Sequence, residues 1–343
     1  MAYTERYVTQ AASGGGDGSI GDPWTLSEAF SNAVAGDRVN VQSDSAYSIG
    51  ATSITGTGTA SQHIIFRGYN STIGDLDTVG RDTPANGSGL ITTNMPAVTL
   101  TGRLDPNAYT IFQNFNFSGA LASAIFGDGL TNSVLMYQCA FLNTQNSAAA
   151  RAVQFDNYSI AIMCDFECSG ADHHDVFDCD EDTRVFACKF TGVVTTSGHS
   201  LCNIRSGTIV GSLFYDGPAH IRYDVQGGGL TCINNTHYNS SQIIDFDFNA
   251  ADANRLPLFI NCHMTDSTEG FTHEYTVANN AIYEVFNRYR DITTLRTNVG
   301  DGLQVGLVET DTGGAETDYT DAGSDDFSLI SSAPGEDAGI SVG

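Results

Sequence analysis

The middle of the chain carries acidic, basic and amide side chains beside residues that are expected to be buried. The buried set is one aromatic or aliphatic residue in each of five short segments: Phe155, Phe177, Ile204, Tyr223 and Phe246. Because side chains alternate along a strand, the neighbours of these residues would face solvent together. The outward set comprises Gln154, Asp156, Asp178, Asn203, Arg205, Arg222, Asp224, Asp245 and Asp247, with His174 and His220 three residues before a buried position.

Carboxylates at this spacing are typical of glycoside hydrolases. If consecutive segments stack as neighbouring strands, Asp224 and Asp247 would lie one strand apart, about 5 Å, which is close to the separation of a retaining pair. Asp178 and Asp224 would lie two strands apart, about 10 Å, which is near the inverting range. These three carboxylates are therefore candidate catalytic residues.

The same face also suits a polysaccharide lyase, which needs a base beside a uronate carboxyl group and a cation that neutralises that group. Arg205 or Arg222 would supply the cation, and His174 or His220 would act as base or acid. The predicted catalytic residues are Asp178, Asp224, Asp247 and His220. The predicted ligand-binding residues are Gln154, Asp156, His174, Asn203, Arg205, Arg222 and Asp245.

Two simpler interpretations of this face stay open. Outward residues are often polar only because they meet water, and surface pairs of Asp and Arg stabilise a fold very little. A groove that binds carbohydrate without cleaving it would use the same side chains. The residues alone therefore leave open whether the chain is an enzyme.

A dense acidic cluster lies near the start of the outward set. Asp178, Asp180 and Asp182 are a candidate Ca²⁺ site, because hard oxygen ligands suit that ion, and a solvated acidic loop is the alternative. The chain has no EF-hand loop and no CxxC pair. Apart from this cluster we predict no metal site and no cofactor.

A repeat of about 24 residues would position these side chains. Seven segments end on an apolar or aromatic residue at steps of 24, 25, 24, 24, 24 and 26 residues: Phe117, Phe141, Phe166, Phe190, Phe214, Tyr238 and Met264. Another position in each segment, five residues earlier, is apolar every time. A unit of this size cannot bury its own apolar face, so the repeats are expected to stack as coils of a solenoid.

Each repeat also indicates a corner and an inward column of small residues. The corner position is occupied by Asn114, Gln138, Met163, Ala187, Gly211, Asn235 and Asn261. Asn and Gly tolerate the left-handed backbone that a corner needs. The position that follows holds Cys139, Cys164, Cys188 and Cys262, which favours buried free thiols over disulfides.

The two ends of the chain depart from the repeat. Thr25 and Glu28 form a capping box that predicts a short helix, with Gly36 at its end, covering the first coil. Residues 265–343 lose the period, and residues 309–326 are acidic and rich in Gly and Thr. We predict an N-terminal segment with a capping helix at 1–37, a parallel β-helix at 38–290, and a loop-rich edge of the same domain at 291–343.

Composition excludes several classes of partner. The 343 residues include 14 Lys and Arg against 40 Asp and Glu, a formal net charge of −26. So few basic residues argue against binding to nucleic acid or to anionic lipid. No apolar run is long enough for a membrane helix, and the first ten residues lack the apolar region of a secretory signal. We predict neither a nucleic-acid nor a membrane partner.

The ends also resemble a known family. Residues 18–26 (GSIGDPWTL) and 35–39 (AGDRV) are similar to the opening of the pectate-lyase-like superfamily, and residues 331–339 (SSAPGEDAG) resemble its close. The resemblance implies an all-β fold, a right-handed single-stranded parallel β-helix. Polysaccharide lyases, glycoside hydrolases, epimerases and phage tailspikes share this fold. The Asn-Thr-Asp and Gly-His-Gly motifs of polygalacturonase-like members are lacking, and residues 198–200 (GHS) are the nearest match.

The expected lack of a secretory signal favours one of these classes. A secreted enzyme should carry a signal, whereas a phage protein leaves the cell by lysis. We predict a virion surface protein of a bacteriophage (spike, fibre or capsid decoration), a homotrimer in the phage particle that contacts other virion proteins and host polysaccharide. The alternatives are a polysaccharide lyase or glycoside hydrolase acting through the outward face, and a bacterial adhesive surface protein, both extracellular.

Overall fold

The fold is built from parallel strands that stack turn upon turn. The computed structural model describes residues 2–77, 90, 92–127, 133–193, 199–223, 229–246, 257–273, 282–297, 304–305, 309–311, 319–321 and 326–329. Two compact units are present: Met1–Arg81 with Leu90–His173, and Asp82–Gly89 with His174–Gly343. The chain is nearly all β, with turns of about 25 residues and one short helix. The predicted all-β parallel β-helix is confirmed.

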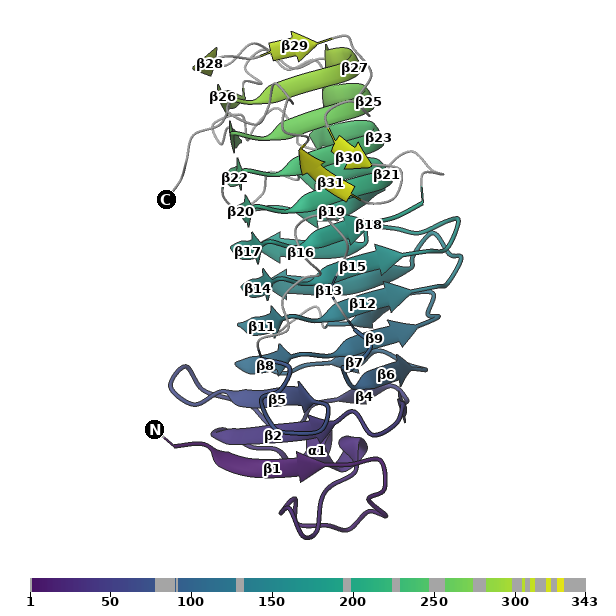
Figure 1. Ribbon diagram of the computed structural model, residues 1–343, viewed down its shortest axis with the longest axis vertical. Helices are drawn as coiled ribbons and strands as arrows, with labels where there is room; N and C mark the ends of the chain where they lie inside the picture. Colours follow the sequence, from purple (N-terminus) through teal and green to yellow (C-terminus); the bar gives the residue numbers. More distant parts are fainter. Residues whose placement is uncertain are drawn as a thin grey trace. The chain divides into compact units, whose positions relative to one another are not determined.

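In the first unit, successive turns contribute strands to two parallel sheets (Figure 1). One sheet contains β1 (Thr4–Val8), β2 (Asp37–Gln42), β5 (Ile64–Tyr69), β8 (Thr110–Gln113), β11 (Val134–Tyr137) and β14 (Ser159–Ile162). The other contains β3 (Tyr47–Ile49), β4 (Thr52–Ser53), β6 (Ala97–Leu100), β7 (Leu104–Asp105), β9 (Asn116–Gly119), β10 (Ala124–Phe126), β12 (Ala140–Asn143), β13 (Arg151–Asn157) and β15 (Asp165–Cys168).

The second unit repeats this arrangement. One sheet contains β17 (Thr183–Phe186), β20 (Gly207–Val210), β22 (Leu230–Ile233), β24 (Leu258–Ile260), β26 (Tyr283–Val285) and β28 (Gln304–Val305). The other contains β16 (Phe177–Glu181), β18 (Lys189–Thr191), β19 (Ser200–Ile204), β21 (Leu213–Tyr223), β23 (Thr236–Phe246), β25 (His263–His273), β27 (Arg288–Thr297) and β29 (Glu309–Asp311). An antiparallel pair, β30 (Tyr319–Asp321) and β31 (Asp326–Leu329), follows.

Aromatic ladders fill the interior of each unit. In the first unit Phe117, Phe141 and Phe166 stack with ring centroids 5.3 and 5.4 Å apart. In the second unit Phe190 and Phe214 stack at 4.6 Å. These spacings follow from the distance between neighbouring strands, so the parallel register itself produces the ladders. The repeat in the sequence marks these interior positions correctly.

The predicted capping helix is present as α1 (Leu26–Asn32). The Thr25 side chain accepts from the Glu28 amide, and the Glu28 carboxylate accepts from the Thr25 amide, which completes the capping box. Leu26, Ala29 and Phe30 turn into the core. The helix ends with Ala33 as its C-cap, three residues before the predicted Gly36, which has a left-handed φ of 88°.

The corners confirm the alignment of the repeats with one exception. Left-handed φ values of 51° to 63° occur at the six predicted corner residues Asn114, Gln138, Met163, Ala187, Gly211 and Asn261. The seventh prediction, Asn235, is wrong, because the left-handed residue is Asn234. The alignment of this turn is therefore displaced by one residue, and His237 rather than Tyr238 pairs with Phe214. A slip of one residue exchanges the two faces of a strand, so His237 occupies the interior ladder.

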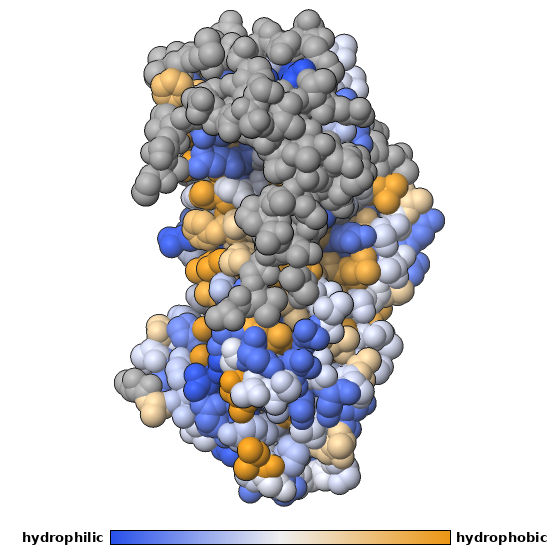
Figure 2. Space-filling model, in the orientation of Figure 1, coloured by the Kyte–Doolittle hydropathy of each residue, from blue (hydrophilic) through white to orange (hydrophobic). Residues whose placement is uncertain are grey.

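The polar residues are mostly outside and the thiols inside. All eight cysteines are free and buried, including the four assigned to an inward column, so that placement is confirmed. In the coloured part of the face drawn in Figure 2, hydrophilic residues are interspersed with hydrophobic ones. None of the described residues belongs to a helix long and apolar enough to cross a membrane.

Candidate functional site

Five polar residues form one column across neighbouring strands of the second unit. The parallel register pairs Asp178 with Asn203, Asn203 with Arg222, Arg222 with Asp245, and Asp245 with Thr272, on strands β16, β19, β21, β23 and β25. The residue before each member is fully buried, so the members themselves face outward. We call this set the Asp178 column. It unites four of the predicted site residues.

The lower end of the Asp178 column is organised by a hydrogen bond. Asn203 donates from Nδ2 to Oδ1 of Asp178 at 3.0 Å. Asp178 retains only 9% of its accessible surface, whereas Arg222 and Asp245 are half-buried. The column therefore presents an ordered carboxylate and amide beside a guanidinium and a second carboxylate.

A second column lies two residues further along the strands. Arg205 donates to Asp180 at 2.7 Å, and the two side chains are 35% and 26% exposed. The sequence placed Asp178 in the column of Arg205, and that placement is wrong by two residues. Phe177 pairs with Cys202 rather than with Ile204, so Asp178 lies beside Asn203.

A third set of polar residues lies on the same face, three residues before the Asp178 column. Gln242 pairs with Glu269 across β23 and β25 and donates to its carboxylate at 3.1 Å. Thr272, a member of the Asp178 column, donates to the same carboxylate at 3.2 Å. The sequence interpretation missed Gln242 and Glu269, although their separation of 27 residues is close to one turn of the repeat.

A buried carboxylate holds one of the predicted histidines. Asp175 has no exposed surface and accepts from the Ser200 amide at 2.9 Å and the Ser200 hydroxyl at 2.7 Å. Its other oxygen lies 2.8 Å from Nδ1 of His174, whose ring contacts that of His199 at 4.7 Å. Burial alone would raise the pKa of Asp175, but His174 and Ser200 outweigh burial and lower it. The carboxylate therefore stays ionised at neutral pH and orients His174.

The outward orientation predicted for His220 is wrong. His220 is fully buried, and its Nδ1 lies 3.3 Å from Nδ1 of His237. Asp216 interrupts the regular strand geometry of β21 with a left-handed φ of 51°, and beyond it both His220 and Ile221 are fully buried. Burial and the neighbouring His237 lower the pKa of His220 well below its usual value. An interior imidazole cannot reach a ligand on the outer face.

The other predicted residues lie in the first unit or outside the described residues. Gln154 and Asp156 lie on β13, in the first unit, and the Asp156 side chain is outside the described residues. Asp224 and Asp247 also lie outside the described residues. The two glycosidase-like pairs that involve them stay predictions.

The candidate Ca²⁺ ligands point to different partners. Asp178 accepts from Asn203, Asp180 accepts from Arg205, and Asp182 is exposed with a left-handed φ of 46°. Within the described part of the chain, no three His, Cys, Asp or Glu side chains are grouped to hold a metal ion. A Ca²⁺ site that also uses other residues stays a prediction.

No protein-family model matches the sequence, and no curated protein matches it. Among solved structures, the pectate lyase Pel9A is similar over 97% of this chain and 91% of its own, with 13% identity and a TM-score of 0.51. The fold is that of the pectate-lyase-like β-helix. The polysaccharide lyase Pedsa3628 of family PL6, from Pseudopedobacter saltans, has 13% identity over 78% of this chain and 75% of its own, with a TM-score of 0.48. A rhamnogalacturonan lyase has 10% identity over 95% of both chains, with a TM-score of 0.42.

Proposed function

We propose that the chain binds an acidic polysaccharide along the Asp178 column and cleaves it by β-elimination. The observation that carries this proposal is the position of Arg222 between Asn203 and Asp245, one strand away on either side. A planar guanidinium binds a carboxylate through two parallel hydrogen bonds, which suits the carboxyl group of a uronic acid. The flanking amide and carboxylate suit the hydroxyl groups of the same sugar.

The chemistry assigns a role to each side chain. Arg222 binds the uronate carboxylate and stabilises the negative charge that develops when the proton on the adjacent carbon leaves. Asp245, about 5 Å away along the column, takes that proton. The electron pair of the broken C–H bond forms a C=C double bond, the glycosidic C–O bond breaks, and the leaving oxygen takes a proton from water. Asn203 and Asp178 hold the neighbouring sugar.

A hydrolytic mechanism is less well supported by the column. Asp178 and Asp245 are three strands apart, about 14 Å, which exceeds the carboxylate separations of both retaining and inverting enzymes. The closer pairs predicted from the sequence involve Asp224 and Asp247. The similarity of fold to the pectate lyase Pel9A is consistent with elimination, although at 13% identity the shared feature is the fold.

The roles as a virion surface protein, a homotrimer or a bacterial adhesin stay predictions. The described residues contain an ordered polar column suited to a uronate, and no feature among them favours a capsid or tail location. A bacterial adhesin would bind the same polysaccharide without cleaving it, so product formation separates these functions.

The test is an assay for unsaturated products on a panel of acidic and neutral polysaccharides. We expect product from an acidic polysaccharide alone, and a loss of about 10²-fold in rate for Arg222→Ala and for Asp245→Asn. The matched control is Arg184→Ala, which removes an exposed arginine from β17 in the other sheet of the same unit and should leave the rate unchanged. No product from any acidic substrate, or full activity in Arg222→Ala, would overturn the proposal.

A further inference from the structure

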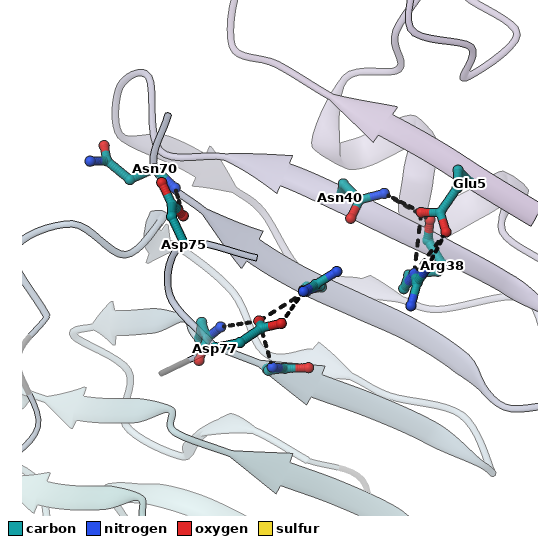
Figure 3. Close-up of polar contacts among 9 residues, drawn as sticks. Glu5, Arg38, Asn40, Asn70, Asp75 and Asp77 are labelled. Carbon is teal, nitrogen blue, oxygen red and sulfur yellow. Dashed lines mark hydrogen bonds and ion pairs between the residues drawn. The ribbon is translucent and has the colours of Figure 1, made fainter. Parts of the chain in front are cut away.

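On the outer face of the first unit, three side chains bind a carboxylate of the chain itself, and we call this set of donors the pocket. Arg67 donates from Nε to Oδ1 of Asp77 at 3.0 Å and from Nη2 to Oδ2 of the same carboxylate (Figure 3). Gln113 and Asn114 donate to Oδ1 of Asp77 at 2.9 and 3.4 Å. One carboxylate thus receives four hydrogen bonds from three side chains, two of them from a guanidinium.

The donors of this pocket belong to the solenoid. Arg67 on β5 and Gln113 on β8 are paired in the parallel register, and Asn114 is the corner residue that follows, with a φ of 63°. Tyr137 on β11 is the next residue in register after Gln113 and is half-buried on the same outer face. A cation, an amide and an aromatic ring therefore succeed one another over about 10 Å.

Asp77, by contrast, comes from a loop that has its own anchors. The Asp75 carboxylate accepts from the backbone amides of Asn70, Ser71 and Thr72 at 2.8 to 3.0 Å, which closes the loop on itself (Figure 3 shows the contact with Asn70). Leu76 is buried in a small cluster with Leu90 and Met95. Removal of the Asp77 carboxylate would therefore empty the pocket without releasing the loop.

One acceptor at the pocket lacks a partner. Asn114 is fully buried, and its Oδ1 makes no hydrogen bond with any described residue, although its Nδ2 reaches Asp77. A buried amide oxygen without a donor is costly, and a hydroxyl group is a donor of suitable size. The pocket thus offers donors for a carboxylate and an acceptor for a hydroxyl, the two groups that a uronic acid carries together.

We propose that Arg67, Gln113 and Asn114 form a binding subsite for the carboxylate of a uronic acid, with Asp77 occupying it in the absence of ligand. Arg67 binds the sugar carboxylate, Asn114 accepts from a sugar hydroxyl, and Tyr137 lies against the next sugar ring. An acidic peptide would also supply a carboxylate. It would not supply hydroxyl groups for the amide side chains, and it would not supply a sugar face for the Tyr137 ring. The subsite is separate from the Asp178 column, which lies in the other unit.

The test is calorimetric titration of Asp77→Ala with a uronic-acid trisaccharide, the equivalent neutral trisaccharide and a peptide of the same net charge. All variants carry Arg222→Ala, so that binding at the Asp178 column does not contribute and failure of one proposal does not decide the other. We expect Asp77→Ala to bind the acidic sugar about tenfold or more tightly than the Asp77 parent does. The neutral sugar and the peptide should show no such gain, and adding Arg67→Gln should abolish it.

The matched control is Glu5→Ala, which removes the carboxylate that Arg38 and Asn40 bind on the same sheet (Figure 3). In this variant the remaining donors are two side chains, Arg38 and Asn40, rather than three. We therefore expect no gain in affinity for the acidic sugar. As a second measurement, acetate but not chloride should raise the melting temperature of Asp77→Ala. The absence of a gain with the acidic sugar, an equal gain with the neutral sugar or the peptide, or an equal gain in Glu5→Ala would overturn the proposal.

Discussion

The side-chain amide of Asn203 donates a 3.0 Å hydrogen bond to Asp178 on the neighbouring strand of the same sheet. The pair lies in a nearly buried part of the outer face, where Asp178 keeps only 9% of its accessible surface. A hydrogen bond to a carboxylate is worth more than one between neutral groups, and its loss leaves a charge with fewer partners. The contact therefore stabilises the fold and fixes the orientation of the carboxylate.

Replacement of Asn203 by Ala should lower the free energy of unfolding by about 1.5–3 kcal/mol. The matched control is Asn239→Gly, which removes an equivalent amide that donates to Asp216 at an exposed position and keeps a residue that tolerates the left-handed φ of 53° there. That substitution should change stability by less than about 0.5 kcal/mol. Urea unfolding of both variants measures the difference, and equal losses would show that burial of Asp178 contributes nothing.

The buried histidines should make the protein sensitive to acid. Burial and the neighbouring His263 lower the pKa of His237 to about 3, whereas an unfolded histidine titrates near 6.5. Between these values the unfolded chain binds a proton that the folded chain does not, so stability is lost as the pH falls from about 6.5 toward about 3. The loss from this group is about 1.4 kcal/mol per pH unit.

His237→Phe should remove that component while keeping the aromatic stack with Phe214, whose ring centroid lies 4.8 Å from that of His237. The measurement is the free energy of unfolding of both proteins at a series of pH values between 4 and 8. The difference between them should grow steadily below about pH 6.5. Parallel curves would contradict the assignment of a neutral imidazole to the core.

Ser200→Ala should reveal the ionised state of Asp175. The hydroxyl of Ser200 donates to this buried carboxylate at 2.7 Å and helps to lower its pKa. Stability from a lowered carboxyl pKa is present above the unfolded value of about 3.9 and is lost as the pH falls through the folded value. We expect a cost of about 1.5–3 kcal/mol at pH 7 that shrinks in strong acid. The exposed Ser241→Ala serves as the control.

The thiols should be unreactive in the folded protein. All eight are buried, and burial raises the pKa of Cys262 to about 12 and those of Cys202 and Cys232 well above the usual value. The thiolate is the reactive form, so a thiol reagent at pH 8 should show no rapid phase with native protein. All eight thiols should react after denaturation. A rapid native phase would identify a cysteine that the fold exposes.

The sequence predicts the ladders and corners well because each turn buries side chains at the same positions of the repeat. It fails where one turn differs in length: the corner at Asn234 instead of Asn235 brings His237 into the core. It fails again in β21, where the strand geometry is interrupted and His220 is buried. Both errors arise from the path of the backbone between two strands, which the spacing of apolar residues does not reveal.

The two candidate sites also differ in how far the sequence predicts them. Four members of the Asp178 column were predicted from alternation along strands, although Asp178 itself required a shift of two residues. The pocket around Asp77 could not be predicted, because Arg67 and Asp77 meet through a loop whose closure depends on Asp75 and Leu76. Contacts between neighbouring strands of a sheet follow the repeat, and contacts between a loop and a strand do not.

The regular turn length has a consequence for how such a protein can change. In the first unit, β8, β11 and β14 place Phe112, Met136 and Ala161 in register at intervals of 24 and 25 residues. Duplication or deletion of one whole turn preserves every inward and outward column, whereas insertion of a single residue within a strand reverses its faces. Each added turn lengthens the outer face by about 4.8 Å. The length of the outer face can therefore grow or shrink in units of one turn, by the copying of a short stretch of gene.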